Sequence, residues 1–211
     1  MRKISKTEGF EPDSLRQWKA RNSGKTYSDL TEKERQDIRA ACLEEQFYLC
    51  AYCCQSISGK SHDCMNEHIE ARQITPNRSL DFTNIVASCT TPKQCDDSHG
   101  SQALPLTPFM PECETEFEFK LSGRVAGKSV RAVEAIKVLN LGDREQNNRS
   151  LIEKRKQLVQ SLLFINGVDP SEGLDDNDLI EMVVEELSEP ENGKLEAYAP
   201  VAVNVLRQWV E

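Results

Sequence analysis

The chain has 211 residues, of which 38% are hydrophobic, and its 26 lysines and arginines against 35 acidic residues give a net charge of -9. This apolar content is enough for a core and excludes a wholly disordered chain, while the length predicts one domain or slightly more. No apolar run approaches the roughly 20 residues of a membrane span, and no apolar segment of a secretory signal follows the charged N-terminus. We therefore expect a cytoplasmic protein with no membrane partner.

The first region, 1–49, is predicted to be a basic arm followed by a helix. Seven lysines and arginines stand against three acidic residues in 1–25, which is typical of an arm that contacts phosphates or of a solvated flexible end. Thr31 and Glu34 form a capping-box pattern, and apolar residues then recur at helical spacing. The helix is therefore expected to begin near Thr31.

Residues that bind metals concentrate in the next region, because six of the eight cysteines and all three histidines lie in 50–99. Four of these cysteines form two spaced pairs, Cys50 with Cys53 and Cys89 with Cys95. The first pair has the Cys-x2-Cys spacing of a turn that aims two thiolates at one ion, and four thiolates would complete a tetrahedral zinc site. Cys54 could replace Cys53 as a ligand. The alternative is that all of these cysteines are small buried hydrophobic side chains that bind no metal.

An acid and an imidazole stand side by side between the two cysteine pairs, at Glu67 and His68. Neighbouring residues on a strand point to opposite faces, so one side chain could bind a metal while the other addresses a water molecule. Asn84 directly precedes a short apolar stretch, and His99 follows Cys95 by four residues.

The second half of the chain is predicted to be helical after one hairpin. The pattern of 117–126 alternates around a Ser-Gly turn, as in a β-hairpin. Apolar periodicity and the prolines and glycines between the periodic segments predict four helices, over residues 129–139, 150–165, 178–187 and 200–210. We assign 109–165 to the hairpin and first helices, and 166–211 to a helical region with 12 acidic and 2 basic residues.

The order of these motifs resembles that of the HNH endonuclease family. The order is Cys-x2-Cys, Glu-His-Ile, Asn-Ile-Val-x-x-Cys, and a last cysteine with a nearby histidine. The wider sequence, to about residue 164, is similar to the HNH nuclease subunit of Septu and retron-associated anti-phage systems. The resemblance implies an α+β fold: a ββα-metal finger with a zinc knuckle over 50–108, within a mainly α-helical chain that also carries a short β-hairpin.

The resemblance also implies roles for individual residues. His68 matches the general base, which suits an imidazole at neutral pH. Glu67 matches a ligand of the catalytic divalent cation, Mg²⁺ or Mn²⁺, and Asn84 matches the residue that orients the base or joins the metal shell. His99 is the candidate for the last histidine, on the helix of the finger, and for a further metal ligand. The proline that the family often has shortly after the base is absent.

The implied activity is hydrolysis of phosphodiester bonds in DNA or RNA, tRNA included, by a defence complex with an ABC/SMC-type ATPase subunit. The retron reverse transcriptase and its multicopy single-stranded DNA are further implied partners. Alternatives are a non-catalytic zinc-binding module and, with little support, a cysteine-based redox or hydrolytic enzyme.

The net acidic charge is unusual for a nuclease, but cations recur after the finger. They are expected to form a nucleic-acid face or solvated helix surfaces: Lys128, Arg131, Lys137, Arg144, Arg149, Lys154, Arg155 and Lys156. The acidic region 166–211 is expected to dock on the partner or to mask the site.

Overall fold

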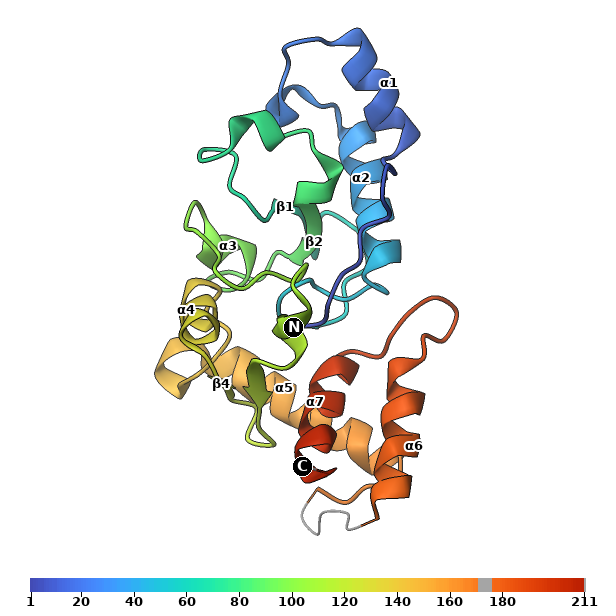
Figure 1. Cartoon of the computed structure of the whole chain (residues 1–211), viewed down its shortest axis with the longest axis vertical. Coiled ribbons are helices and arrows are strands. Elements are labelled where there is room, and N and C mark those ends of the chain that lie inside the picture. Colours follow the sequence, from blue (N-terminus) through green and yellow to red (C-terminus); the bar gives the residue numbers. More distant parts are fainter. Residues whose placement is uncertain (171–175, 211) are drawn as a thin grey trace.

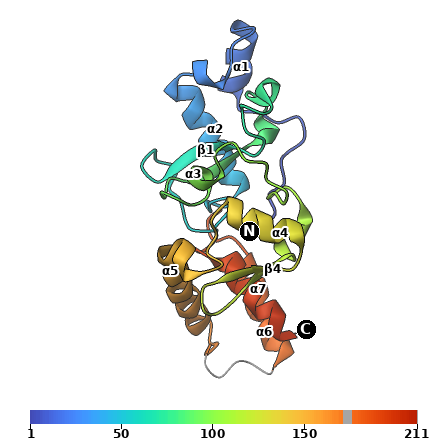
Figure 2. The ribbon, with the colours of Figure 1, turned by 90° about the vertical axis from the view of Figure 1, so that its left-hand side faces the viewer.

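The structure is a computed structural model that describes residues 1–170 and 176–210. This part of the chain is a mixed α+β protein with seven α-helices and two small antiparallel sheets, which confirms the α+β class of the prediction. Within it, no helix is both long and apolar enough to cross a membrane. Helices α1 and α2 lie toward one end of the long axis of the molecule, and α6 and α7 lie toward the other (Figures 1 and 2).

The N-terminal segment is fixed on the body of the protein and is not a free arm. Met1 and Ile4 are buried, and the Ile4 N–H donates to the carbonyl of Pro108 at 2.7 Å. A helix that was not predicted, α1 (Asp13–Arg21), follows. The predicted helix is α2 (Glu32–Glu45), and its capping box at Thr31 is confirmed.

The first sheet joins the two strands that carry the metal-binding motifs. Strand β1 (Cys64–His68) pairs antiparallel with β2 (Ile85–Cys89), with His68 opposite Ile85. The one-turn helix α3 (Asp96–His99) comes next, so the order is strand, strand, helix. The buried amide of Gln46, at the end of α2, exchanges two hydrogen bonds with the backbone of Ala87 at 2.7 and 2.8 Å. This contact fixes α2 against β2.

Short 3₁₀-helices connect these elements, namely η1 (Tyr27–Asp29), η2 (Pro76–Arg78), η3 (Phe82–Asn84) and η4 (Pro111–Glu114). The predicted hairpin is confirmed as β3 (Phe117–Phe119) and β4 (Val125–Gly127). The four predicted helices are present as α4 (Val130–Val138), α5 (Glu145–Ile165), α6 (Asn177–Ser188) and α7 (Ala199–Val210). Helix α5 begins at Glu145, before the predicted start at residue 150. Asn148 has non-helical angles, and the periodic pattern from which the helix was predicted begins only after this interruption.

The acidic C-terminal helices share their core with the rest of the chain. The Tyr198 N–H donates to the carbonyl of Cys54 at 2.9 Å, and the Leu195 N–H donates to that of Phe47 at 3.1 Å. Asn204 on α7 also bonds to the backbone of Phe117 and Phe119 in β3. The region 166–211 is therefore acidic on its surface but contributes apolar side chains to the common core.

The hairpin turn lies tightly against α5, and Gly123 makes this approach possible. Its φ is +81°, and a Cβ at this position would lie 2.1 Å from the carbonyl oxygen of Ile152. Gly24 has a similar φ of +77° but has no atom within 4 Å of its would-be Cβ.

We therefore expect Gly123→Ala to lower the free energy of unfolding by about 1–3 kcal/mol more than Gly24→Ala, because only the first adds overpacking to the cost of a left-handed alanine. Chemical denaturation of the two variants measures this difference. Equal losses would contradict the close approach of hairpin and helix.

Candidate functional site

Four buried cysteines have ligand atoms that all lie within 4.8 Å of one another. In residues 1–170 and 176–210, no other group of three or more Cys, His, Asp or Glu side chains is arranged to hold a metal ion in this way. The four cysteines are Cys50, Cys53, Cys89 and Cys95. The Sγ atoms of Cys50 and Cys95 are 3.8 Å apart, and those of Cys53 and Cys89 are 4.0 Å apart. The edge of a tetrahedron is about 3.8 Å when each Zn–S bond is about 2.3 Å. The cluster therefore has the size that a structural zinc ion requires.

The backbone turn after Cys50 decides which neighbouring cysteine joins the cluster. The Cys54 N–H donates to the Cys50 carbonyl at 3.1 Å, and the Cys50 N–H donates to the Gln55 carbonyl at 2.8 Å. Cys54 then takes a left-handed φ of 64° and is not a member of the cluster. The geometry thus favours Cys53, of the two neighbours that the sequence left open.

The second cysteine pair comes from the end of a strand and the start of a helix. Cys89 ends β2, and Cys95 directly precedes α3 with a φ of 53°. The Cys95 N–H donates to the Leu139 carbonyl at 2.9 Å, which anchors this loop on the residue after α4.

Hydrogen-bond donors surround the sulfur atoms. The Gln94 amide nitrogen lies 3.6 Å from the Cys89 sulfur, and the Cys89 N–H lies 3.3 Å from the Cys50 sulfur. Asn148, at the interruption of α5, donates to the side-chain oxygen of Gln94, Oε1, at 3.1 Å. This bond orients the Gln94 amide. Such outer contacts stabilise thiolates around a metal.

Burial raises the pKa of the Cys95 thiol well above its usual value. A bound cation would favour the thiolate form of this side chain.

A cleft of about 600 Å³ lies beside the cysteine cluster, and its lining includes Glu67, His68, Arg72 and Asp96. Glu67 and His68 stand at the end of β1, and Asp96 begins α3. The end of β1 and the start of α3 therefore both line the cleft.

Glu67 is the centre of the acidic side of the cleft. Its Oε1 accepts a hydrogen bond from the Tyr52 hydroxyl at 3.1 Å and lies 2.5 Å from His99 Nδ1. Its carboxyl group also interacts with that of Asp96. Burial, and then the adjacent Glu67, raise the pKa of Asp96 to about 8, so the two acids share a proton at neutral pH.

Glu67 and Asp96 offer oxygen atoms of the kind that a hard divalent cation prefers, and two adjacent acids in a partly buried site favour a cation in place of the shared proton. Among the described residues, they do not form with His99 a group whose ligand atoms all lie within 4.8 Å of one another. His99 is buried and is not among the described residues that line the cleft. Its Nδ1 contacts Glu67, and its Nε2 has no partner among the described residues.

His68 has the form of a general base. Its Nε2 lies 2.9 Å from the Ser79 carbonyl oxygen, which can only accept a hydrogen bond, so the lone pair of the neutral ring is on Nδ1. Burial lowers the pKa of His68 to about 4, and the ring is therefore neutral at pH 7. The ring of Tyr27 contacts it edge-on, with centroids 4.7 Å apart.

Asn84 does not line the cleft with Glu67 and His68. Its Oδ1 accepts from the Glu70 N–H at 2.8 Å, and its Nδ2 donates to the Glu70 carbonyl at 3.0 Å. Both ends of the amide therefore hold the backbone two residues beyond His68. This geometry suits orientation of the base and offers no support for Asn84 as a metal ligand.

Two cleft residues were not predicted from the sequence, namely Arg72 and Asp96, and neither was Tyr52, which contacts Glu67 from behind the cleft surface. Asp96 follows a predicted zinc ligand and precedes His99 by one helical turn, so its position could have indicated it. Tyr52 lies inside the Cys-x2-Cys motif, where its link to Glu67 depends on the fold. Arg72 is the one lysine or arginine among the described residues that line the cleft.

The predicted basic stretch after the finger does not form a continuous cationic face. Arg131 pairs with Glu116, with its Nη2 2.5 Å from the carboxylate, and Lys137 and Arg144 each have an acidic neighbour within 4 Å. Arg155 is fully buried and donates to the carbonyls of Gly123 and Leu141 at 2.8 and 3.0 Å. Part of the expected phosphate-binding surface therefore has internal roles.

The two C-terminal helices, of which α6 is acidic and α7 has no acidic residue, do not mask the cleft in this structure. The cleft is lined by residues between Ser28 and Ser101, and α6 and α7 lie at the other end of the molecule (Figure 1).

A comparison of the sequence with protein-family models and with curated proteins finds no match. The function is therefore inferred from the cysteine cluster and the cleft beside it.

From the geometry of the cluster we expect substitutions of Cys53 and Cys54, which are adjacent and both buried, to affect the zinc content of the protein differently. We expect Cys53→Ser to lose most of the bound zinc, because it removes one of four thiolates, and Cys54→Ser to retain it. Metal analysis of the purified variants by mass spectrometry measures this, and thermal unfolding should show a lower Tm for Cys53→Ser alone. The reverse order would assign the site to Cys54.

Proposed function

We propose that this chain is a metal-dependent endonuclease of the HNH type that hydrolyses phosphodiester bonds in nucleic acid. The observation that carries the proposal is a neutral, buried His68, held through Nε2 by a backbone carbonyl, in one cleft with Glu67 and Asp96. An isolated surface histidine would have neither the fixed tautomer nor the acidic neighbours.

In this proposal His68 is the general base. Its Nδ1 takes a proton from a water molecule as the water oxygen attacks the scissile phosphorus, and the bond from phosphorus to the 3′ oxygen breaks. The products carry 5′-phosphate and 3′-hydroxyl ends. Asn84 positions the base by holding the backbone of Glu70.

Glu67 and Asp96 would hold Mg²⁺ or Mn²⁺ on the other side of the cleft, and His99 would orient Glu67 through its Nδ1. When bound, the cation supplies positive charge to the phosphate and to the leaving oxygen. Tyr52 donates to Glu67 at 3.1 Å and keeps its carboxylate directed toward His99 and Asp96.

We further propose that the chain is the effector subunit of an anti-phage complex with an ATPase partner. A net charge of -9 and a cleft with one arginine among its described lining residues offer little attraction for nucleic acid. A partner that binds nucleic acid would compensate for this. The acidic surface of α6, remote from the cleft, is available to a basic surface of that partner.

His68→Ala tests the nuclease proposal directly. We expect it to lower the cleavage rate at least about 100-fold, because a general base contributes roughly that factor, while bound zinc is unchanged. The assay uses DNA and total RNA, with Mg²⁺ or Mn²⁺, for the chain alone and co-purified with its ATPase partner.

His62→Ala is the matched control, because this histidine is exposed and lies outside the cleft. It should cleave like the unaltered chain. Full activity of His68→Ala would contradict the assigned base, and a folded, zinc-loaded chain inactive on every substrate would favour the non-catalytic zinc module.

Arg72 provides a second test, since it is the one cation among the described cleft residues. Its guanidinium lies 5.1 Å from the centroid of the Tyr27 ring, and we assign it to phosphate binding. Arg72→Gln should raise KM about tenfold or more, as expected for the loss of a charged hydrogen bond. Arg124→Gln, an exposed arginine on the hairpin turn that pairs with Glu145, should leave KM unchanged. A loss confined to kcat would contradict this assignment.

A further inference from the structure

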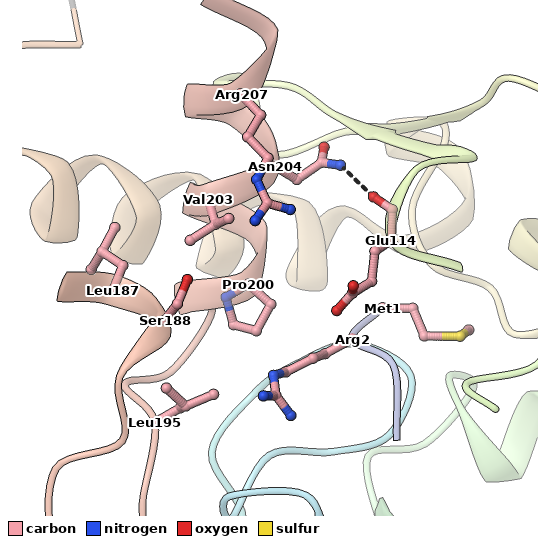
Figure 3. A pocket seen from close by; sticks show the side chains of 10 residues that line it. All are labelled: Met1, Arg2, Glu114, Leu187, Ser188, Leu195, Pro200, Val203, Asn204 and Arg207. Carbon is pink, nitrogen blue, oxygen red and sulfur yellow. Dashed lines mark hydrogen bonds between the residues drawn. The ribbon is translucent and has the colours of Figure 1, made fainter. Parts of the chain in front are cut away.

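A second pocket, of about 210 Å³, lies where the N-terminal segment meets η4, α6 and α7. It shares none of its described lining residues with the cleft. Figure 3 shows Leu187, Pro200 and Val203 lining it on the side of the helices, with Arg207 entering from α7 and Arg2 from the N-terminal segment.

Most polar side chains of this pocket already have partners within the protein. The Ser188 hydroxyl donates to a carbonyl of its own helix at 2.6 Å. The Asn204 amide donates to the carbonyls of Glu114 and Phe117 at 3.1 and 2.9 Å, and the Glu114 carboxylate accepts from the backbone N–H of Lys3 at 3.1 Å.

The two guanidinium groups are different. Neither Arg2 nor Arg207 forms an ion pair with any residue in the described part of the chain. Arg2 lies over the ring of Phe47, 4.4 Å from its centroid. Arg207 is exposed and is one of 2 basic residues against 12 acidic residues in 166–211. Both arginines therefore keep hydrogen-bond donors open toward the pocket.

We propose that this pocket binds a carboxylate carried on a short aliphatic chain. The two arginines outnumber Glu114, the one acidic side chain among the described lining residues, so the pocket attracts an anion. Leu187, Leu195 and Val203 offer buried apolar surface to the aliphatic part. The pocket is smaller than the roughly 300–1,000 Å³ of sites for drug-sized ligands.

The ligand is therefore of amino-acid size. It is either a free branched-chain acid or the C-terminal residue of a polypeptide, since both present the same chemistry. This site is independent of the nuclease proposal.

The test is titration of the zinc-loaded full chain with N-acetyl-leucine, followed by calorimetry and by amide chemical shifts. We expect saturable binding with shifts in α7, and N-acetyl-leucinamide, which lacks the carboxylate, should bind at least about tenfold more weakly. Arg207→Gln should lose about the same factor. Arg21→Gln, an exposed arginine outside the pocket with no ion pair among the described residues, should bind like the unaltered chain.

A peptide that ends in leucine with a free carboxylate distinguishes the two sources. Tighter binding of the peptide assigns a polypeptide C-terminus, and equal binding assigns a free acid. The proposal is overturned if neither probe binds, if the amide binds as well as the acid, or if inorganic phosphate binds as tightly as N-acetyl-leucine.

Discussion

The convergence of four cysteine sulfurs is the constraint on which the rest of this structure depends. It joins the turn after α2, the end of β2 and the start of α3, which are separated by up to 45 residues of chain. Each of these segments is short, and the sheet has only two strands. A metal held by four thiolates would add to the contacts that hold them in place, such as that of Gln46 with Ala87 and the shared apolar core.

The same cluster positions the cleft. Tyr52, between the first two cysteines, donates to Glu67, and Asp96 follows the fourth cysteine directly. Two of the three side chains that interact with the acid at the centre of the cleft, Tyr52 and Asp96, thus lie next to cysteines of the cluster. The second half of the chain is attached to the same cluster, because Asn148 orients Gln94 and Tyr198 bonds to the carbonyl of Cys54. The cysteine cluster, the cleft and the helical half are therefore parts of one packed structure.

Charge is distributed unevenly over this structure. Several arginines that could bind phosphate are used internally, and Arg155 is enclosed between the hairpin turn and the residues after α4. The acidic helices lie far from the cleft. A nucleic-acid substrate would therefore meet few exposed cations near the reacting groups, which is why a second subunit belongs to the proposed function.

The sequence by itself determined the four-cysteine group, the capping box of α2, the hairpin and the positions of α4 to α7, because spacing, periodicity and turn residues are local properties of the chain. It left open the choice between Cys53 and Cys54, and it predicted neither α1 nor the contacts of Asp96, Tyr52 and Asn148. Only the tertiary structure decided these points, and it also gave Asn84 a backbone contact and buried Arg155. The reason is physical: a side chain's partner, burial and pKa are set by segments distant in sequence, whereas helix and turn patterns depend on neighbours.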